Sequence, residues 1–113
     1  MSDDVDAAAI VAFGVSGANT TTPWDVNGAL PATNSANANS QATVSGVSTT
    51  NANTLMIGFA SNRNGQTYDT HVDTGNGYSA VAFRDNGSGG LWSTLGVEQK
   101  LFSSAQTGIT VQF

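Results

Sequence analysis

Apolar and polar residues alternate in short runs along most of the chain, and clusters of Gly, Asn, Ser and Thr separate these runs. A period of two is typical of strands, and short runs at this spacing are typical of all-β domains. No part of the chain has a convincing helical period, so we expect almost no helix. About seven short runs are predicted to be extended, with 65–72 either a strand or an extended loop: 7–15, 42–47, 54–60, 65–72, 78–84, 91–102 and 109–113.

One face of these strands is predicted to form the core. Its members are large apolar residues at alternating positions: Leu55, Ile57, Phe59, Val81, Phe83, Leu95, Val97, Ile109 and Val111. The run 7–15 is apolar on both faces, which predicts a strand covered on both sides. Trp92 alternates in phase with the polar residues Thr94, Glu98 and Lys100, so we expect this face of 91–102 to be exposed.

Three Asn-Gly pairs lie between the central runs, at Asn64-Gly65, Asn76-Gly77 and Asn86-Gly87. Asn-Gly supplies the positive φ angles of tight hairpin turns, so the pairs favour antiparallel neighbours over crossover helices. The chain is therefore predicted to be one domain, 1–113, with an antiparallel β-sandwich fold. We expect residues 1–6 to form an acidic tail and residues 16–41, which hold both prolines, to form a long loop.

Composition excludes several classes of function. Only 10% of the residues are charged, the net charge is −5, and Lys and Arg number three. Three cations cannot neutralise a useful run of phosphates or form the basic face of a membrane-surface protein, so we expect no nucleic-acid partner and no membrane insertion. Nothing resembles a signal peptide, and no apolar run is long enough for a transmembrane helix. The chain has no cysteine, which excludes disulfides and thiolate chemistry.

Three blocks of sequence suggest a family. They are Val15–Asp25 (VSGANTTTPWD), Thr43–Phe59 (TVSGVSTTNANTLMIGF) and Glu98–Val111 (EQKLFSSAQTGITV). Together they resemble β-sandwich modules of phage tail-fibre and virion proteins and of bacterial surface proteins. The resemblance implies a jelly-roll-like sandwich and a structural role in an extracellular assembly. Because such modules carry further strands before the first block and after the last, we expect another subunit to supply strands here.

The candidates for catalysis and metal binding are few. His71 is the sole histidine, and Asp69 and Asp73 share its side of a predicted strand. Alternating polar residues on an exposed strand produce the same pattern, so we predict that the protein is not an enzyme and uses no cofactor. One His is a poor start for a zinc site. The acidic loop Asp69–Gly77 departs from the calcium-loop pattern at two positions, so no metal site is predicted.

Exposed aromatic residues leave two functions open. We expect Trp24 to plug one end of the sandwich, whereas Trp92, Tyr68 and Tyr78 are candidates for stacking on a ligand. The candidate contacts with other subunits are Trp92, Ile109, Val111 and Phe113. The favoured prediction is a non-enzymatic structural or adhesive subunit at a virion or cell surface, self-associating through edge strands into a ring or filament. The alternative is a carbohydrate-binding module that recognises a surface glycan.

Overall fold

Strands dominate the computed structural model of the protein, which describes residues 10–35, 42–63, 74–88 and 91–113. Within these residues the elements are β1 (Thr43–Val47), β2 (Thr54–Arg63), the single-turn 3-10 helix η1 (Thr74–Asn76), β3 (Ser79–Ser88), β4 (Leu91–Phe102) and β5 (Ile109–Gln112). The prediction of a β-rich chain with almost no helix is confirmed for this part of the chain. No helix among the described residues is long and apolar enough to cross a bilayer.

The strands form two antiparallel sheets, one of β1 and β5 and one in the order β2–β4–β3. β4 is the central strand of the larger sheet and pairs with β2 over an unbroken register from Thr54↔Phe102 to Arg63↔Ser93. β3 pairs along the other edge of β4, with a register shift between Ala80 and Ala82. The long central strand therefore fixes the positions of both its neighbours.

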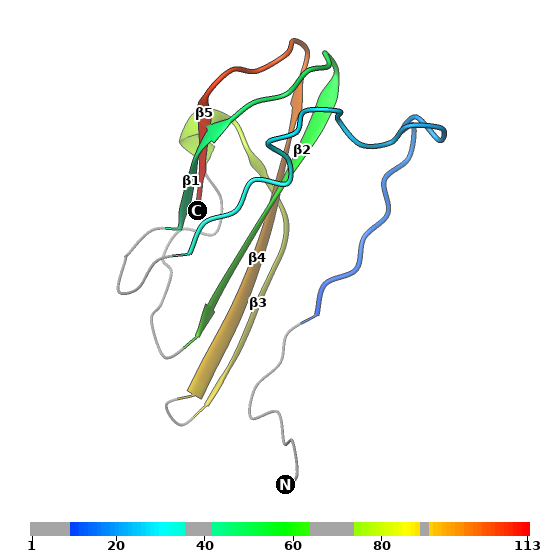
Figure 1. Ribbon diagram of the computed structural model, residues 1–113. Helices are drawn as coiled ribbons and strands as arrows, with labels where there is room; N and C mark the ends of the chain where they lie inside the picture. The colour runs from blue at the N-terminus through cyan, green and yellow to red at the C-terminus, as the bar shows by residue number, and fades with distance from the viewer. Residues whose placement is uncertain (1–9, 36–41, 64–73, 89–90) are drawn as a thin grey trace, which may run out of the picture.

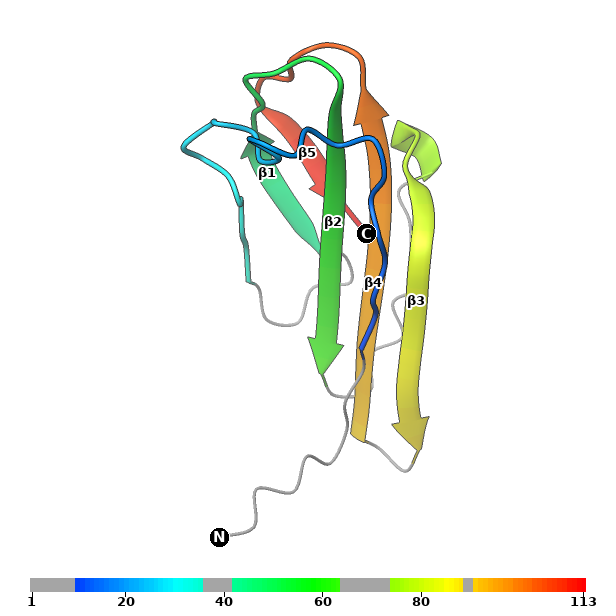
Figure 2. The ribbon, with the colours of Figure 1, turned by 90° about the vertical axis from the view of Figure 1, so that its right-hand side faces the viewer.

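The two faces of the three-stranded sheet are covered differently (Figures 1 and 2). The β1–β5 pair packs against one face, here called the inner face. Residues 10–15, here called the arm, run along the opposite or outer face without forming a strand. Residues 16–35 then cross the end of the sheet and descend beside β1 (Figure 1).

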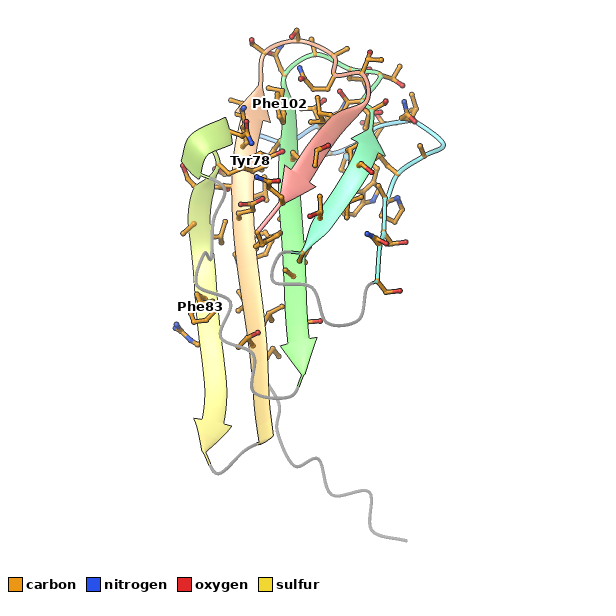
Figure 3. The ribbon with its side chains drawn as sticks, turned by 90° about the vertical axis from the view of Figure 1, so that its left-hand side faces the viewer. Tyr78, Phe83 and Phe102 are labelled. Carbon is orange, nitrogen blue, oxygen red and sulfur yellow. The ribbon has the colours of Figure 1, made fainter. Side chains whose placement is uncertain are left out.

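The core lies between the inner face and the β1–β5 pair. Its buried residues and the apolar residues packed against them are Val47, Tyr78, Phe102, Val111, Leu30, Ala32, Val44, Met56 and Ile109. Tyr78 and Phe102 meet edge to face with ring centroids 6.3 Å apart (Figure 3). The Phe113 ring lies over Gly58, where an added Cβ would come within 3.1 Å of it. Phe113 therefore packs into the core of its own chain.

Five of the predicted runs are strands in the described residues. The arm was predicted to belong to a strand covered on both sides; this is wrong for residues 10–15, which are extended but unpaired in any sheet. The run 65–72 lies outside the described residues. Two of the Asn-Gly pairs that were predicted to form hairpin turns lie in other structures. Asn86-Gly87 lies within β3 opposite Ser93 and Trp92, and Gly77 has the expected positive φ of 77° but leads from η1 into β3.

The predicted core face was wrong in part, because residues from two different faces were assigned to one. Leu55, Ile57 and Phe59 share a face with Leu95 and Val97, as the register of β2 and β4 shows, but this is the outer face. Ile109 and Val111 instead belong to the sheet that covers the inner face. Both faces of β2 and β4 carry apolar residues, so alternation alone did not identify the one that the second sheet covers.

A bulge in β3 changes which side chains share a face. Residues opposite each other in an antiparallel pair point to the same side of the sheet. Ala80 pairs with Glu98 and Phe83 with Gly96, so both lie on the inner side although an odd number of positions separates them. The extra residue is Val81. Tyr78, expected to face outward, is instead 4% exposed.

We expect Gly58→Ala to lower the free energy of unfolding by about 1–3 kcal/mol, because the new methyl group overpacks the space between the sheets. Its Cβ would meet Glu98 Cγ and the Phe113 ring, each at 3.1 Å. Urea unfolding measures the change. Gly28→Ala is the matched control, because no atom lies within 4 Å of a Cβ at that position. Equal losses of stability in the two variants would contradict the packing of Phe113 on Gly58.

Candidate functional site

The outer face of the three-stranded sheet carries large apolar side chains that solvent reaches. Phe59 is 62% exposed in the middle of β2, and Leu101 is 68% exposed near the end of β4, where it pairs with Leu55. Val97, which pairs with Phe59, is fully buried. The outer face is therefore covered over part of its area only, and large exposed apolar side chains gathered on one face are typical of a contact site.

The arm accounts for the partial cover. The Phe13 ring stacks on the Phe59 ring with centroids 6.2 Å apart and an interplanar angle of 30°. Ile10, Phe13 and Val15 nevertheless remain exposed themselves. The arm thus adds apolar surface to the outer face as well as covering it.

Charge is sparse on this face. Among the residues whose side chains are described, Arg84 is its one charged member, placed opposite Leu95 and exposed. Glu98 and Lys100 alternate onto the inner face. A partner for the outer face therefore needs apolar surface and no strong complementary charge.

The face of β4 that was predicted to be exposed is buried. Thr94 is 6% exposed and Glu98 has no exposed surface, and the Phe113 ring lies over Gly58 beside Glu98. The backbone of Trp92 belongs to the same strand, but its side chain lies outside the described part of the structure. Because Thr94 and Glu98 are buried, the phase that Trp92 shares with them does not indicate an exposed side chain.

Lys100 joins η1 to the central strand. Its ammonium group donates a hydrogen bond to the backbone carbonyl of Asn76. The same group lies 4.7 Å from the ring centroid of Phe102 and 5.5 Å from that of Tyr78, within the range of cation–π attraction. Tyr78 was predicted as a candidate for stacking on a ligand. Its ring instead packs in the core and contacts the Lys100 ammonium group.

The predicted subunit contacts in β5 serve the chain's own core. Val111 and Phe113 are buried, and Ile109 packs against the core cluster. Among the described residues β1 and β5 pair only with each other, so they too have unpaired edges; in the larger sheet the edge strands are β2 and β3, which each pair only with β4. Each of these edge strands is ten residues long.

Asp25 ties the crossing segment to the loop between β1 and β2. Its Oδ1 accepts hydrogen bonds from the backbone N–H groups of Asn27 and Thr50 at 2.9 and 3.0 Å. Its Oδ2 accepts from Asn51 at 2.9 Å and from Thr50 at 3.1 Å. The Thr50 and Asn51 amides lower the pKa of the Asp25 carboxyl below its ordinary value of 3.8.

Next to this carboxylate, Trp24 is 84% exposed. The expectation that Trp24 plugs one end of the fold is therefore wrong. The indole stands on a loop held by other residues: Asp25 holds the Thr50 and Asn51 amides, and Leu30 packs against the core. Val26, two residues on, is also exposed.

The residues considered for catalysis and calcium lie largely outside the described residues. This applies to His71, Asp69 and Asp73, and also to Tyr68, which was a candidate for stacking on a ligand. Among the described residues, no three His, Cys, Asp or Glu side chains gather as a metal site would require. The predictions of no catalysis and no metal therefore stay predictions.

Comparisons with protein-family models, with curated proteins and with solved structures each find no match for this chain. The resemblance to modules of phage and bacterial surface proteins therefore stays a prediction. Any inference about function therefore rests on the geometry and chemistry of the chain itself.

The sequence analysis did not predict the exposure of the outer face or the hydrogen bonds of Asp25. Phe59 and Leu101 were visible as apolar residues at alternating positions, but alternation does not tell which face is covered. The Asp25 clamp had a local signal, because an Asp two residues before Asn27 is typical of an Asx turn. Its bonds to Thr50 and Asn51, 25 and 26 residues away, had no signal.

We expect the Asp25 carboxyl to titrate with a midpoint below 3.8, its ordinary value, because ionisation strengthens its bonds to backbone N–H groups. A folded-state pKa below the unfolded one means that this carboxylate stabilises the fold above the unfolded pKa. The stabilisation is lost as the pH falls through the lower folded pKa. The amide ¹H shifts of Thr50 and Asn51, followed by NMR against pH, report the midpoint.

Asp25→Asn is the control for that titration, since it keeps one acceptor oxygen and cannot ionise. The shared pH-dependent step at Thr50 and Asn51 should disappear in this variant. A midpoint at or above 3.8 in the parent would show that the clamp does not form in solution.

Proposed function

We propose that the chain is a non-enzymatic structural subunit that self-associates through the outer face of its three-stranded sheet. The observation that carries this proposal is the exposure of two large apolar side chains on that face, Phe59 in the middle of β2 and Leu101 near the end of β4. Full burial of a Leu or Phe side chain contributes about 1.5–3 kcal/mol, so the exposed part of each side chain forgoes about 1–2 kcal/mol. A second layer over the outer face recovers this free energy.

A second copy of the same chain is the occupant that fits best. The outer face already accepts an apolar segment of this sequence, since Phe13 stacks on Phe59. That segment pairs with no sheet strand, so the arm of a neighbouring copy can replace it at small cost. Reciprocal exchange gives a closed dimer, whereas head-to-tail exchange gives a ring or a filament.

The free edges of β2 and β3 support the same proposal. A long edge strand presents unpaired backbone N–H and C=O groups, which pair with a strand from another chain. Both edges border the outer face, so one neighbour can use the edge and the face together. The side chains of β5 pack into the core, whereas β2 and β3 border the exposed outer face, so we place the proposed edge contact at β2 and β3.

We also propose how the two sheets form one fold. We infer that the two sheets are the halves of a jelly-roll-like β-sandwich, as in the phage and bacterial surface modules that the sequence resembles. Two antiparallel sheets around a shared core and the near absence of helix support this inference. We further propose an extracellular virion or cell-surface location, which the same resemblance implies.

We expect the parent protein to associate as its concentration rises and the double variant Phe59→Ser/Leu101→Ser to remain at 11.5 kDa. The substitutions remove the apolar contact without opening a cavity, because both side chains are more than half exposed. Sedimentation velocity up to about 1 mM protein, where even weak contacts are populated, measures the change. Each substitution should alter the free energy of unfolding by about 1 kcal/mol or less.

Val26→Ser is the matched control, because Val26 is equally exposed but lies on the crossing segment and not on the sheet. This variant should associate like the parent. A parent that stays monomeric at every concentration would refute the proposal. So would a double variant that associates as strongly as the parent.

A further inference from the structure

We propose that Trp24 forms the platform of a binding site for a neutral carbohydrate. The site lies on the segment that crosses the end of the three-stranded sheet, and its residues are distinct from those of the outer face. It goes beyond the proposed self-association and does not depend on it.

The exposed indole of Trp24 lies on a loop whose backbone is fixed by the neighbouring residues. Trp24 follows Pro23, whose ring fixes its own φ. On the other side, the Asp25 carboxylate accepts three backbone N–H groups and fastens the chain to the loop between β1 and β2. A binding group fixed in this way loses little conformational entropy when a ligand arrives.

A second turn precedes the indole. Asn19 Oδ1 accepts hydrogen bonds from the backbone N–H groups of Thr21 and Thr22, and Asn19 Nδ2 donates to Thr22 Oγ1. Ordered backbone therefore flanks Trp24 on both sides. The high exposure of the indole is a built feature of the loop and not the result of a loose chain.

The chemistry near the indole suits a sugar ring. Exposed hydroxyl and amide side chains occur in both linked loops, and they belong to Thr20, Thr21, Thr22, Thr50, Asn51 and Asn53. A pyranose presents an apolar C–H face and a rim of hydroxyl groups. The indole face attracts the C–H groups through its quadrupole, while hydroxyl and amide groups bind the rim.

Charge and area restrict the ligand further. Asp25 is the one charged residue of these two loops, 16–35 and 48–53, and its oxygens already accept backbone N–H groups. With no cation there, an anionic ligand has no counter-charge. Only Trp24 and Val26 contribute large exposed apolar side chains to 16–35, too little for a protein interface, which buries about 800 Å² on each partner. One indole matches one or two sugar rings.

The test uses ¹⁵N-labelled protein and five neutral oligosaccharides: cellohexaose, laminarihexaose, maltohexaose, mannohexaose and chitohexaose. Each is added to about 10 mM, so that a dissociation constant near 1 mM is still measured. At least one should shift the indole N–H signal of Trp24 and the amides of Thr50 and Asn51. Trp24→Ala should weaken that binding at least about tenfold, with an unchanged thermal midpoint because the side chain is so exposed.

Trp24→Tyr should restore part of the affinity, since a smaller aromatic face remains. The Phe59→Ser/Leu101→Ser variant is the control, because it should bind the sugar like the parent even where self-association is lost. The proposal is overturned if no sugar in the panel gives a Trp24-dependent shift. It is also overturned if Trp24→Ala reduces self-association and leaves sugar binding unchanged.

Discussion

The packing of β4 on both of its faces is the constraint on which the structure depends. Val97 and Glu98 are neighbours on opposite sides of this strand, and neither has exposed surface. β4 also separates β2 from β3, so every residue of the larger sheet is positioned relative to it. A central strand of this kind needs one layer on each side, and the chain supplies a sheet for one side and an arm for the other.

The inner side shows how a polar face becomes part of a core. Glycines at 58 and 96 leave room in the sheet, and the Phe113 ring lies over Gly58 beside Glu98. The large rings of Phe102, Phe113 and Tyr78 are buried on the same side of the sheet as the Glu98 side chain. Polarity in the sequence therefore did not mark the solvent side.

The outer side leads to the functional proposals. A single extended segment covers it, and Phe59 and Leu101 stay open to a further layer. The proposed carbohydrate site is at the end of the sheet, on a loop that Asp25 fastens to the β1–β2 connection. A subunit that assembles through a sheet face and presents an indole from its end can display many copies of a weak site. Multivalent display converts weak single contacts into strong attachment.

The sequence by itself determined the strands and the class of fold. Alternation over 42–47, 54–60, 78–84, 91–102 and 109–113 predicted all five strands of the described residues, because a period of two is a local property of the chain. Gly77 was also read correctly as a position with positive φ, a requirement set by its own backbone. For the candidate site, only the type of residue could be predicted: exposed aromatic side chains were expected, but at Trp92, Tyr68 and Tyr78 and not at Trp24.

Only the tertiary structure decided which apolar face is covered, where Tyr78 points and that Trp24 is exposed. β2 and β4 are apolar on both sides, so the answer depends on which distant segment packs on which face. The bulge at Val81 reverses the alternation of β3, and the clamp at Asp25 joins residues 25 and 26 positions apart. Periodicity records the two faces of a strand, whereas burial is decided by contacts between segments that are far apart in the chain.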